Sequence, residues 1–143
     1  MGILAIDVDH FKSINDTYGH PAADKVLKMM SARLRSCVYR ATDTVARIGG
    51  DEFTIILSDV KDIKTYEKLA GKILRLMSAP IVIDGHEISV GISIGIASFP
   101  RDGADPEEVK SAADNALYDA KRSGRNTYAI FAQEKKPNLK VVR

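Results

Sequence analysis

Hydrophobic residues change their spacing several times along the chain, and each change marks a border between two predicted elements. An unbroken apolar run at residues 3–8 predicts a buried strand whose odd-numbered side chains, continuing to Asp7 and Asp9, share one face of the sheet. Apolar residues then recur three and four apart, which predicts a helix over about residues 22–39.

The rest of the chain is divided in the same way. A turn at 49–52 contains two glycines, which we expect to adopt positive φ, and Gly124 is a typical helix stop. Asp105 followed by Pro106 is a typical helix start. The further predicted elements are strands at 44–48 and 53–58, a helix at 63–77, a two-stranded ribbon at 81–90, a strand at 92–99, a helix from Pro106 to Gly124 and a strand at 127–131.

This order of elements predicts an α+β sandwich of the ferredoxin-like or palm type, with a central, mostly antiparallel sheet flanked by helices. In such a fold the first helix returns the chain so that the second strand runs in the same direction as the first. The end of the first strand and the turn after the second then lie at one edge of the sheet. We therefore expect four carboxylates, Asp7, Asp9, Asp51 and Glu52, to meet there.

Composition narrows the class of protein. The chain has 143 residues, 45% hydrophobic and 28% charged, which is typical of one globular domain, here predicted over 1–131 with a polar linker or tail at 132–143. It contains neither a long apolar span nor a signal peptide, so we expect a cytoplasmic protein or the cytoplasmic part of a membrane-anchored one. Because Cys37 is the one cysteine of the sequence, an internal disulfide is excluded. A net charge of +2 argues against nucleic acid as a partner.

Clustered carboxylates repel one another, and a divalent cation is the usual compensation. Oxygen ligands without a cysteine or histidine set favour Mg²⁺ or Mn²⁺, which commonly hold the phosphates of a nucleotide. The alternative is that these residues only end a strand and occupy a solvated turn. Spacing alone leaves the two interpretations balanced.

Motifs at several separate places decide between them. They are Arg47-Ile48-Gly49-Gly50-Asp51-Glu52-Phe53, the segment 7–16, Tyr18-Gly19-His20, Asp24, the segment 93–97 and the segment 113–126. In their order along the chain these motifs resemble the GGDEF domain of bacterial diguanylate cyclases, and the resemblance extends over nearly the whole chain from Ile3 to Phe131.

The resemblance implies a palm-like fold related to class III nucleotidyl cyclases and the condensation of two GTP into cyclic di-GMP with release of two pyrophosphates. It further implies Mg²⁺ or Mn²⁺ and a head-to-head homodimer in which each subunit holds one GTP. The family's domain normally begins with a further helix, which this chain lacks. A sensor or receiver domain upstream and an EAL phosphodiesterase domain downstream are the partners we expect in the full-length protein.

The resemblance also assigns roles to single residues. It implies metal binding by Asp7, the Val8 carbonyl and Asp51, catalysis by Asp51, Glu52 and Lys121, guanine recognition by Asn15 and Asp24, phosphate binding by Lys12, Lys121 and Arg125, and close approach of the nucleotide at Gly49 and Gly50. Without the family pattern, Lys121 and Arg125 would be interpreted as cations at a helix C-terminus and Asn15 as part of a turn.

Arg40 and Asp43 form an Arg-x-x-Asp motif, and five residues separate Asp43 from Gly49. In the resembling family this offset marks an inhibitory site for the product, away from the catalytic edge. Alternatively, Arg40 caps the first helix and Asp43 starts a turn.

Two other classes of function are weighed against the enzyme. A GGDEF domain with weak catalysis that binds GTP or cyclic di-GMP as a regulatory module is the nearer one, and the intact signature at 49–53 argues against it. A nucleic-acid-binding ferredoxin-like module is the other, and an aromatic content of only 6% argues against stacking of bases on the sheet.

Overall fold

The computed structural model describes residues 1–38, 42–59 and 62–132, so most of the predicted tail lies outside the described residues. Its elements are β1 (Gly2–Val8), α1 (Phe11–Tyr18), α2 (His20–Cys37), β2 (Asp43–Gly49), β3 (Glu52–Leu57), α3 (Ile63–Met77), β4 (Ile81–Ile83), β5 (His86–Ile88), β6 (Ile92–Ser98), α4 (Pro106–Arg122) and β7 (Tyr128–Ile130).

The main sheet has five strands in the order β2-β3-β1-β6-β7. β1 pairs antiparallel with both β3 and β6, β2 pairs antiparallel with β3, and only β6 and β7 are parallel. β2 therefore runs in the same direction as β1, as predicted. The ribbon β4–β5 forms a separate two-stranded sheet whose turn residues, Asp84 and Gly85, both have positive φ. The predicted α+β class is confirmed.

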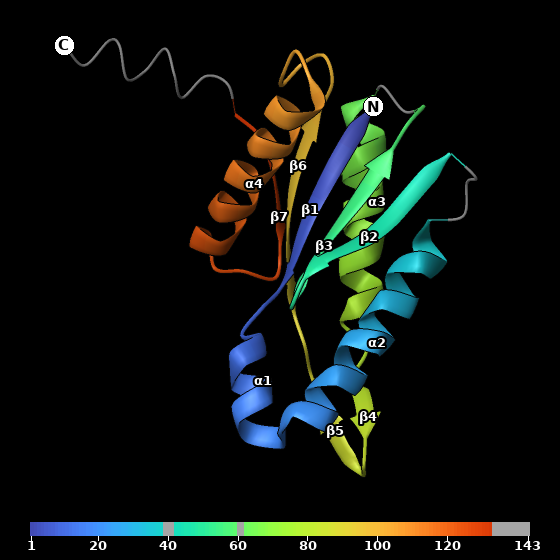
Figure 1. Cartoon of the computed structure of the whole chain (residues 1–143), viewed down its shortest axis with the longest axis vertical. Helices are drawn as coiled ribbons and strands as arrows, with labels where there is room; N and C mark the ends of the chain where they lie inside the picture. The colour runs from blue at the N-terminus through green and yellow to red at the C-terminus, as the bar shows by residue number, and fades with distance from the viewer. Residues whose placement is uncertain (39–41, 60–61, 133–143) are drawn as a thin grey trace, which may run out of the picture.

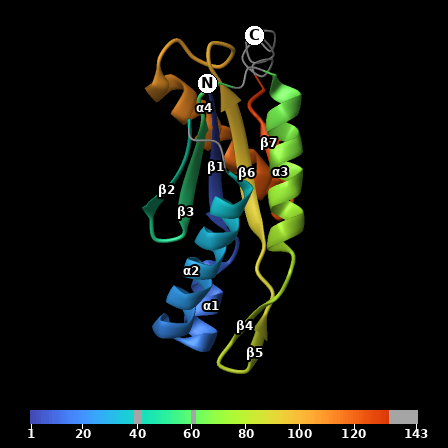
Figure 2. The same ribbon diagram turned by 90° about the vertical axis from the view of Figure 1, so that its right-hand side faces the viewer.

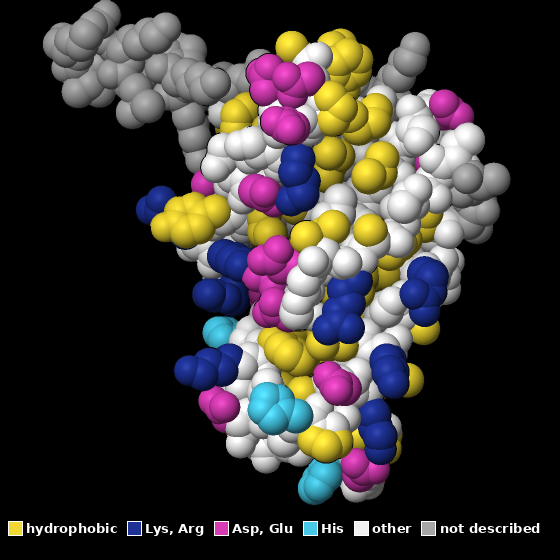
Figure 3. Space-filling view, in the orientation of Figure 1, with side chains coloured by type: hydrophobic (Ala, Val, Ile, Leu, Met, Phe, Trp, Pro, Cys, Tyr) yellow, Lys and Arg dark blue, Asp and Glu magenta, His cyan; other side chains and the backbone are white. Residues whose placement is uncertain are grey.

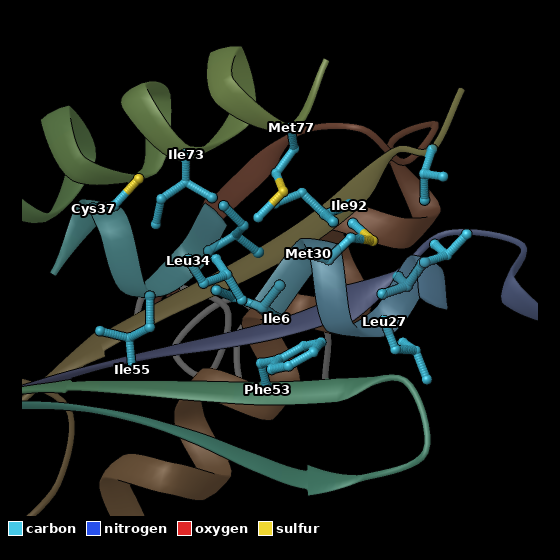
Figure 4. Packing of buried hydrophobic residues seen from close by; sticks show 14 of the residues in the cluster. Ile6, Leu27, Met30, Leu34, Cys37, Phe53, Ile55, Ile73, Met77 and Ile92 are labelled. Carbon is cyan, nitrogen blue, oxygen red and sulfur yellow. The ribbon is translucent and has the colours of Figure 1, made fainter. Parts of the chain in front are cut away.

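Helices cover both faces of the sheet (Figures 1 and 2). α2 and α3 pack on one face, and α4 packs on the other against β1, β6 and β7. The larger core cluster lies between the sheet and α2–α3, where long side chains such as Leu34, Phe53 and Ile73 interdigitate (Figure 4). None of the helices in the described part of the chain is long and apolar enough to cross a membrane.

The sheet and α4 approach each other closely at Gly95 of β6. A Cβ at this position would lie 2.2 Å from both the Ala113 carbonyl oxygen and the Leu117 amide nitrogen. Only glycine leaves room for the α4 backbone here. This close approach brings the C-terminal end of α4 near β1, where Lys121 contacts Asp7.

The first helical region differs from the prediction of one helix over about 22–39. The structure has two helices, divided at Gly19, whose φ of 88° is in the range that favours glycine. α1 was missed because it buries only Ile14, so it carries no apolar periodicity that a pattern could detect.

Candidate functional site

The end of β1 and the β2–β3 turn lie side by side, as the topology predicted (Figure 1). Asp7 is the register partner of Glu52, and the Val8 N–H donates to the Asp51 carbonyl at 3.1 Å. These two segments are more than forty positions apart in the chain. Antiparallel pairing of β1 with β3 brings them together.

Asp7 faces the α4 side of the sheet and is only 8% exposed. Its Oδ2 atom forms an ion pair with Lys121 Nζ from the last turn of α4. Its Oδ1 atom is buried and has no hydrogen-bond partner among the described residues. A buried carboxylate oxygen without a partner is costly, and a cation bound at this oxygen would remove that cost.

Asp51 lies next to Asp7, and their negative charges interact. Burial raises the pKa of the Asp51 carboxyl above its ordinary value, and the charges of Asp7 and Glu52 raise it further. Figure 3 shows acidic side chains gathered in the middle of this face, with Lys and Arg side chains beside them. A carboxylate whose ionisation is disfavoured by a neighbouring carboxylate is suited to sharing a divalent cation with it.

Asp9, one of the four carboxylates predicted to meet at this edge, differs from Asp7 in its hydrogen bonds. Its Oδ1 accepts from Ser93 Oγ at 2.6 Å and its Oδ2 accepts from the Asn126 backbone N–H at 2.9 Å, so both oxygens have partners. In the described residues, no three Asp, Glu, His or Cys side chains form a group that could hold a metal. The pair of Asp7 and Asp51 still fits Mg²⁺, which is usually held by one or two carboxylates together with substrate phosphates.

Sequence reasoning also missed Ser93. It is fully buried in β6, opposite Asp7 in the strand register, and its hydroxyl is committed to Asp9. A serine within the apolar run 92–97 was the available signal, since a buried hydroxyl requires a partner.

Two roles were predicted for the glycines of the β2–β3 turn: positive φ is wrong, and close approach of a nucleotide stays a prediction. Neither Gly49 nor Gly50 has positive φ, and a Cβ at either position would meet nothing within 4 Å. The turn is shaped by a register shift between Arg47 and Gly49 and by Arg47 Nε, which donates to the Gly50 carbonyl at 3.0 Å. These glycines therefore leave open space beside Asp51, where a ligand can approach the backbone.

Three cations were predicted to serve this site, and Lys121 is the one that contacts the carboxylate pair, through Asp7. Lys121 comes from the end of α4, and Arg125 follows in the loop before β7 with a positive φ of 64°. Lys12 lies exposed on α1. Within the described residues, neither Lys12 nor Arg125 has an ion-pair partner, so both side chains are available to an anion.

Asn15 lies on α1 and Asp24 on α2, two helices joined at Gly19. The Oδ1 atom of Asn15 is buried and has no hydrogen-bond partner among the described residues, whereas Asp24 is exposed. An unsatisfied amide oxygen and a free carboxylate are suitable acceptors for the N–H groups of a base.

The predicted Arg40–Asp43 pair is only partly visible, because Arg40 lies outside the described residues. Asp43 begins β2, and its Oδ1 accepts from the Ser58 N–H at 3.2 Å. Asp43 thus has at least one structural contact, and the inhibitory site stays a prediction.

Comparison with known proteins assigns the chain to a family. The family model described as "Diguanylate cyclase, GGDEF domain" matches residues 1–127. The bifunctional diguanylate cyclase/cyclic di-GMP phosphodiesterase MucR of Pseudomonas aeruginosa is 41% identical over 136 residues, which are 95% of this chain and 20% of that protein. Diguanylate cyclase A of Treponema denticola is 41% identical over 131 residues, 91% of this chain and 35% of that protein. The chain thus spans about a third or less of these relatives.

Solved structures agree with the fold. The GGDEF domain of YfiN (TpbB) from Pseudomonas aeruginosa has a TM-score of 0.88 and 39% identity, covering 92% of this chain and 81% of that one. The GGDEF domain of DgcB from Caulobacter crescentus, solved in complex with c-di-GMP, has a TM-score of 0.83 and 27% identity, covering 90% and 76%.

Proposed function

Because this chain belongs to the GGDEF diguanylate cyclase family, we propose that it condenses two GTP into cyclic di-GMP and two pyrophosphates. The observation that carries the proposal is the juxtaposition of Asp7, Asp51 and Lys121 at one edge of the sheet. Carboxylates for a metal and a cation for phosphate are the groups that phosphoryl chemistry requires there.

Mg²⁺ or Mn²⁺ would be held by Asp7, the Val8 carbonyl and Asp51, and when bound it supplies positive charge at the reacting phosphate. Lys121 then has two acceptors to choose from, Asp7 and a phosphate oxygen. If Asp7 held the metal, the Lys121 ammonium would be available to a phosphate oxygen of the nucleotide, where Arg125 and Lys12 would add positive charge.

The guanine base is read by Asn15 and Asp24. The Asp24 carboxylate accepts from guanine N1–H and the exocyclic amino group. The Asn15 amide oxygen, which has no hydrogen-bond partner among the described residues, accepts a further N–H. Gly49 and Gly50 leave the turn open for the nucleotide, and Glu52 beside Asp51 contributes negative charge that tunes the carboxylate pair.

Ring closure requires a homodimer with two half-sites facing each other. The 3′-oxygen of each GTP forms a bond to the α-phosphorus of the other, the bond from that phosphorus to the bridging oxygen breaks, and pyrophosphate leaves with its electron pair. The 3′-hydroxyl proton passes to a base or to solvent. One subunit presents one GTP, so two subunits complete the two symmetric bonds.

The direct test is to incubate the chain with GTP and Mg²⁺ and separate the products by chromatography. We expect cyclic di-GMP from the wild type and none from Asp51→Asn. The thermal unfolding midpoint of this variant should be no lower than that of the wild type, because the substitution removes a charge that burial and Asp7 disfavour. Asp59→Asn, an exposed acid after β3, is the matched control and should retain turnover. Wild-type turnover in Asp51→Asn would refute the metal assignment.

Base preference is tested by calorimetry with GTP and ATP. Adenine presents an acceptor at N1, so the acceptors of the pocket would be left unpaired at a cost of about 1–3 kcal/mol each. We expect a strong preference for GTP that Asp24→Ala largely removes. Equal affinity of the wild type for both nucleotides would exclude this pocket.

Regulation by the product is the next part of the proposal. Arg40 offers a planar set of donors to phosphate or guanine, and Asp43 offers an acceptor, so together they suit cyclic di-GMP. We expect Arg40→Ala to weaken product binding and inhibition while leaving turnover at low product concentration unchanged. Unchanged product affinity would return both residues to structural roles.

A regulatory module with weak catalysis is the second candidate. Two relatives named as cyclic di-GMP phosphodiesterases, NbdA of Pseudomonas aeruginosa and PdeR of Escherichia coli, match 94% of this chain at 37% and 35% identity. Binding of GTP without any cyclic di-GMP formation would favour this candidate. In either case we propose that residues 1–131 are one GGDEF domain of a longer protein with an upstream sensor or receiver domain and a downstream EAL domain.

A further inference from the structure

Asp9 connects three separate segments behind the candidate site. Its carboxylate accepts from Ser93 Oγ at 2.6 Å and from the Asn126 N–H at 2.9 Å, and its own N–H donates to the Gly91 carbonyl at 2.9 Å. Asp9 is 8% exposed. It therefore ties the end of β1 to the start of β6 and to the loop between α4 and β7.

That loop has an unusual backbone and depends on an external partner. Arg125 and Asn126 have consecutive positive φ angles of 64° and 49°, a conformation that side-chain-bearing residues seldom adopt once and rarely twice in succession. The Arg125 N–H donates back to the Ala120 carbonyl in the last turn of α4 at 3.2 Å. The Asn126 N–H instead donates to the Asp9 carboxylate, a charged acceptor that strengthens the bond.

Packing leaves little freedom around this bond. A Cβ on Gly91 would lie 3.0 Å from Asp9 Oδ2 and 3.3 Å from Asn126 Oδ1. Gly91, Asp9 and Asn126 are therefore in close contact, and the turn is held by the carboxylate on one side and by the Gly91 backbone on the other.

We propose that Asp9 is a positioning residue: by holding the Arg125–Asn126 turn against the end of β1, it sets the place of the Arg125 guanidinium at the phosphates of GTP. The role rests on the function proposed above, because Arg125 needs a defined place only if the site binds a nucleotide. Asp7 and Asp9 are thus two adjacent carboxylates on one face with different tasks. Asp7 keeps a free oxygen for a cation, and Asp9 has none.

Conservative and non-conservative variants separate this role from metal binding. In Asp9→Asn the amide oxygen accepts from the Asn126 N–H and the amide nitrogen donates to Ser93 Oγ, so the connection is kept without the charge. Asp9→Ala removes both bonds. A metal ligand would be lost in both variants, because a neutral amide is a poor replacement for a carboxylate.

The experiment uses the whole chain and two measurements. Amide hydrogen exchange at Asn126 is measured without nucleotide, and the affinity for a fluorescent GTP analogue is measured in EDTA and in Mg²⁺. For Asp9→Ala we expect Asn126 to exchange about tenfold faster and GTP to bind about tenfold more weakly under both conditions, whereas Asp9→Asn stays within about threefold of the wild type.

Gly91→Ala is an independent variant in case Asp9→Ala does not fold. Its methyl group would press on Asp9 Oδ2 and on the Asn126 side chain, so the Asp9–Asn126 contact must shift with both side chains intact, and we expect smaller changes in the same direction, faster Asn126 exchange and weaker GTP binding. Asp7→Asn is the contrasting control, which should lose the Mg²⁺ enhancement of binding and keep slow Asn126 exchange.

Each contrary result has a definite meaning. Unchanged Asn126 exchange or GTP affinity in the folded Asp9→Ala or Gly91→Ala variant overturns the positioning role. Loss of the Mg²⁺ enhancement in Asp9→Asn overturns it in favour of a metal ligand. If the wild type binds no GTP, the proposed function fails and this role fails with it, a result that is recognised before any variant is compared.

Discussion

The two faces of the central sheet are packed with side chains of different size. Between the sheet and α2–α3 lies a thick layer of isoleucine, leucine, methionine and phenylalanine, with the buried methionines coming from the two helices. Against α4 the layer is thin, and the buried residues of that helix are mostly alanines: Val109, Ala112, Ala113, Ala116, Leu117 and Ala120. The thick layer contributes most of the buried apolar area and hence most of the stability.

The thin layer matters more for the placement of α4 on the sheet than for the free energy of unfolding. Short side chains and Gly95 bring the α4 backbone against β6, and the helix then delivers Lys121 to Asp7. A layer of long side chains can repack around a change, but contact between backbones cannot. The neighbours Ile94 and Gly95 in β6 face opposite layers, so single-carbon changes there compare the two faces directly.

The largest effect is expected from Gly95→Ala on the α4 face. The added carbon would lie 2.2 Å from backbone atoms of α4, so the helix must move, and we expect a loss of about 3 kcal/mol or more in the free energy of unfolding. GTP turnover should fall as well, because Lys121 moves with the helix. Urea unfolding together with the chromatographic assay measures both quantities. Full stability and full turnover would show that the close approach does not set the position of α4.

A smaller effect is expected from Ile94→Val on the opposite face. Removing one carbon from this fully buried side chain should cost about 0.5–1.5 kcal/mol, because the long neighbours partly close the gap. Turnover per folded molecule should not change. Urea unfolding measures the cost, and an activity loss as large as that of Gly95→Ala would contradict the difference between the faces.

The smallest effect is expected at the edge of the thick layer, where Tyr128 Oη donates to Glu67 Oε2 of α3 at 3.0 Å. This hydrogen bond, followed by burial and the Glu67 charge, raises the pKa of the Tyr128 hydroxyl above its ordinary value. The protonated hydroxyl is thus favoured by folding, so its contribution is present below the unfolded-state pKa of about 10 and is lost as the pH rises through the folded-state pKa.

We therefore expect Tyr128→Phe to lower the free energy of unfolding by about 0.5–1 kcal/mol at neutral pH. Above about pH 10 the wild type should lose this advantage. Urea unfolding of both proteins at several pH values measures the difference, and a difference that grows with pH would contradict the assigned bond.

Elements with strong local signals were predicted well from the sequence. α4 begins after Asp105, whose side chain accepts from the Glu108 N–H at 2.9 Å, and ends just before Gly124 with its positive φ. β1 has the predicted alternation, with Ile3 and Ala5 toward α4 and Leu4 and Ile6 toward the larger core. Helix ends and strand alternation depend on residues only a few positions apart, so the local sequence pattern is enough to predict them.

The candidate site was predicted in part. The motif at 49–53 and the crossover topology place Asp51 beside Asp7, and the structure confirms that the two segments meet. The prediction of positive φ at Gly49 and Gly50 was wrong, because a pair of glycines in a hairpin sequence does not fix the φ angles. This turn bends through a register shift instead.

The sequence by itself determined the order of the elements, the face on which Asp7 and Asp9 lie and the family to which the chain belongs. Only the tertiary structure decided that these two carboxylates differ. The partners of Asp9 lie 84 and 117 residues away in the chain, at Ser93 and Asn126, whereas one oxygen of Asp7 has none among the described residues. Alternation along a strand is a local property of the backbone, but a hydrogen bond depends on atoms that folding brings within about 3 Å of each other from distant segments.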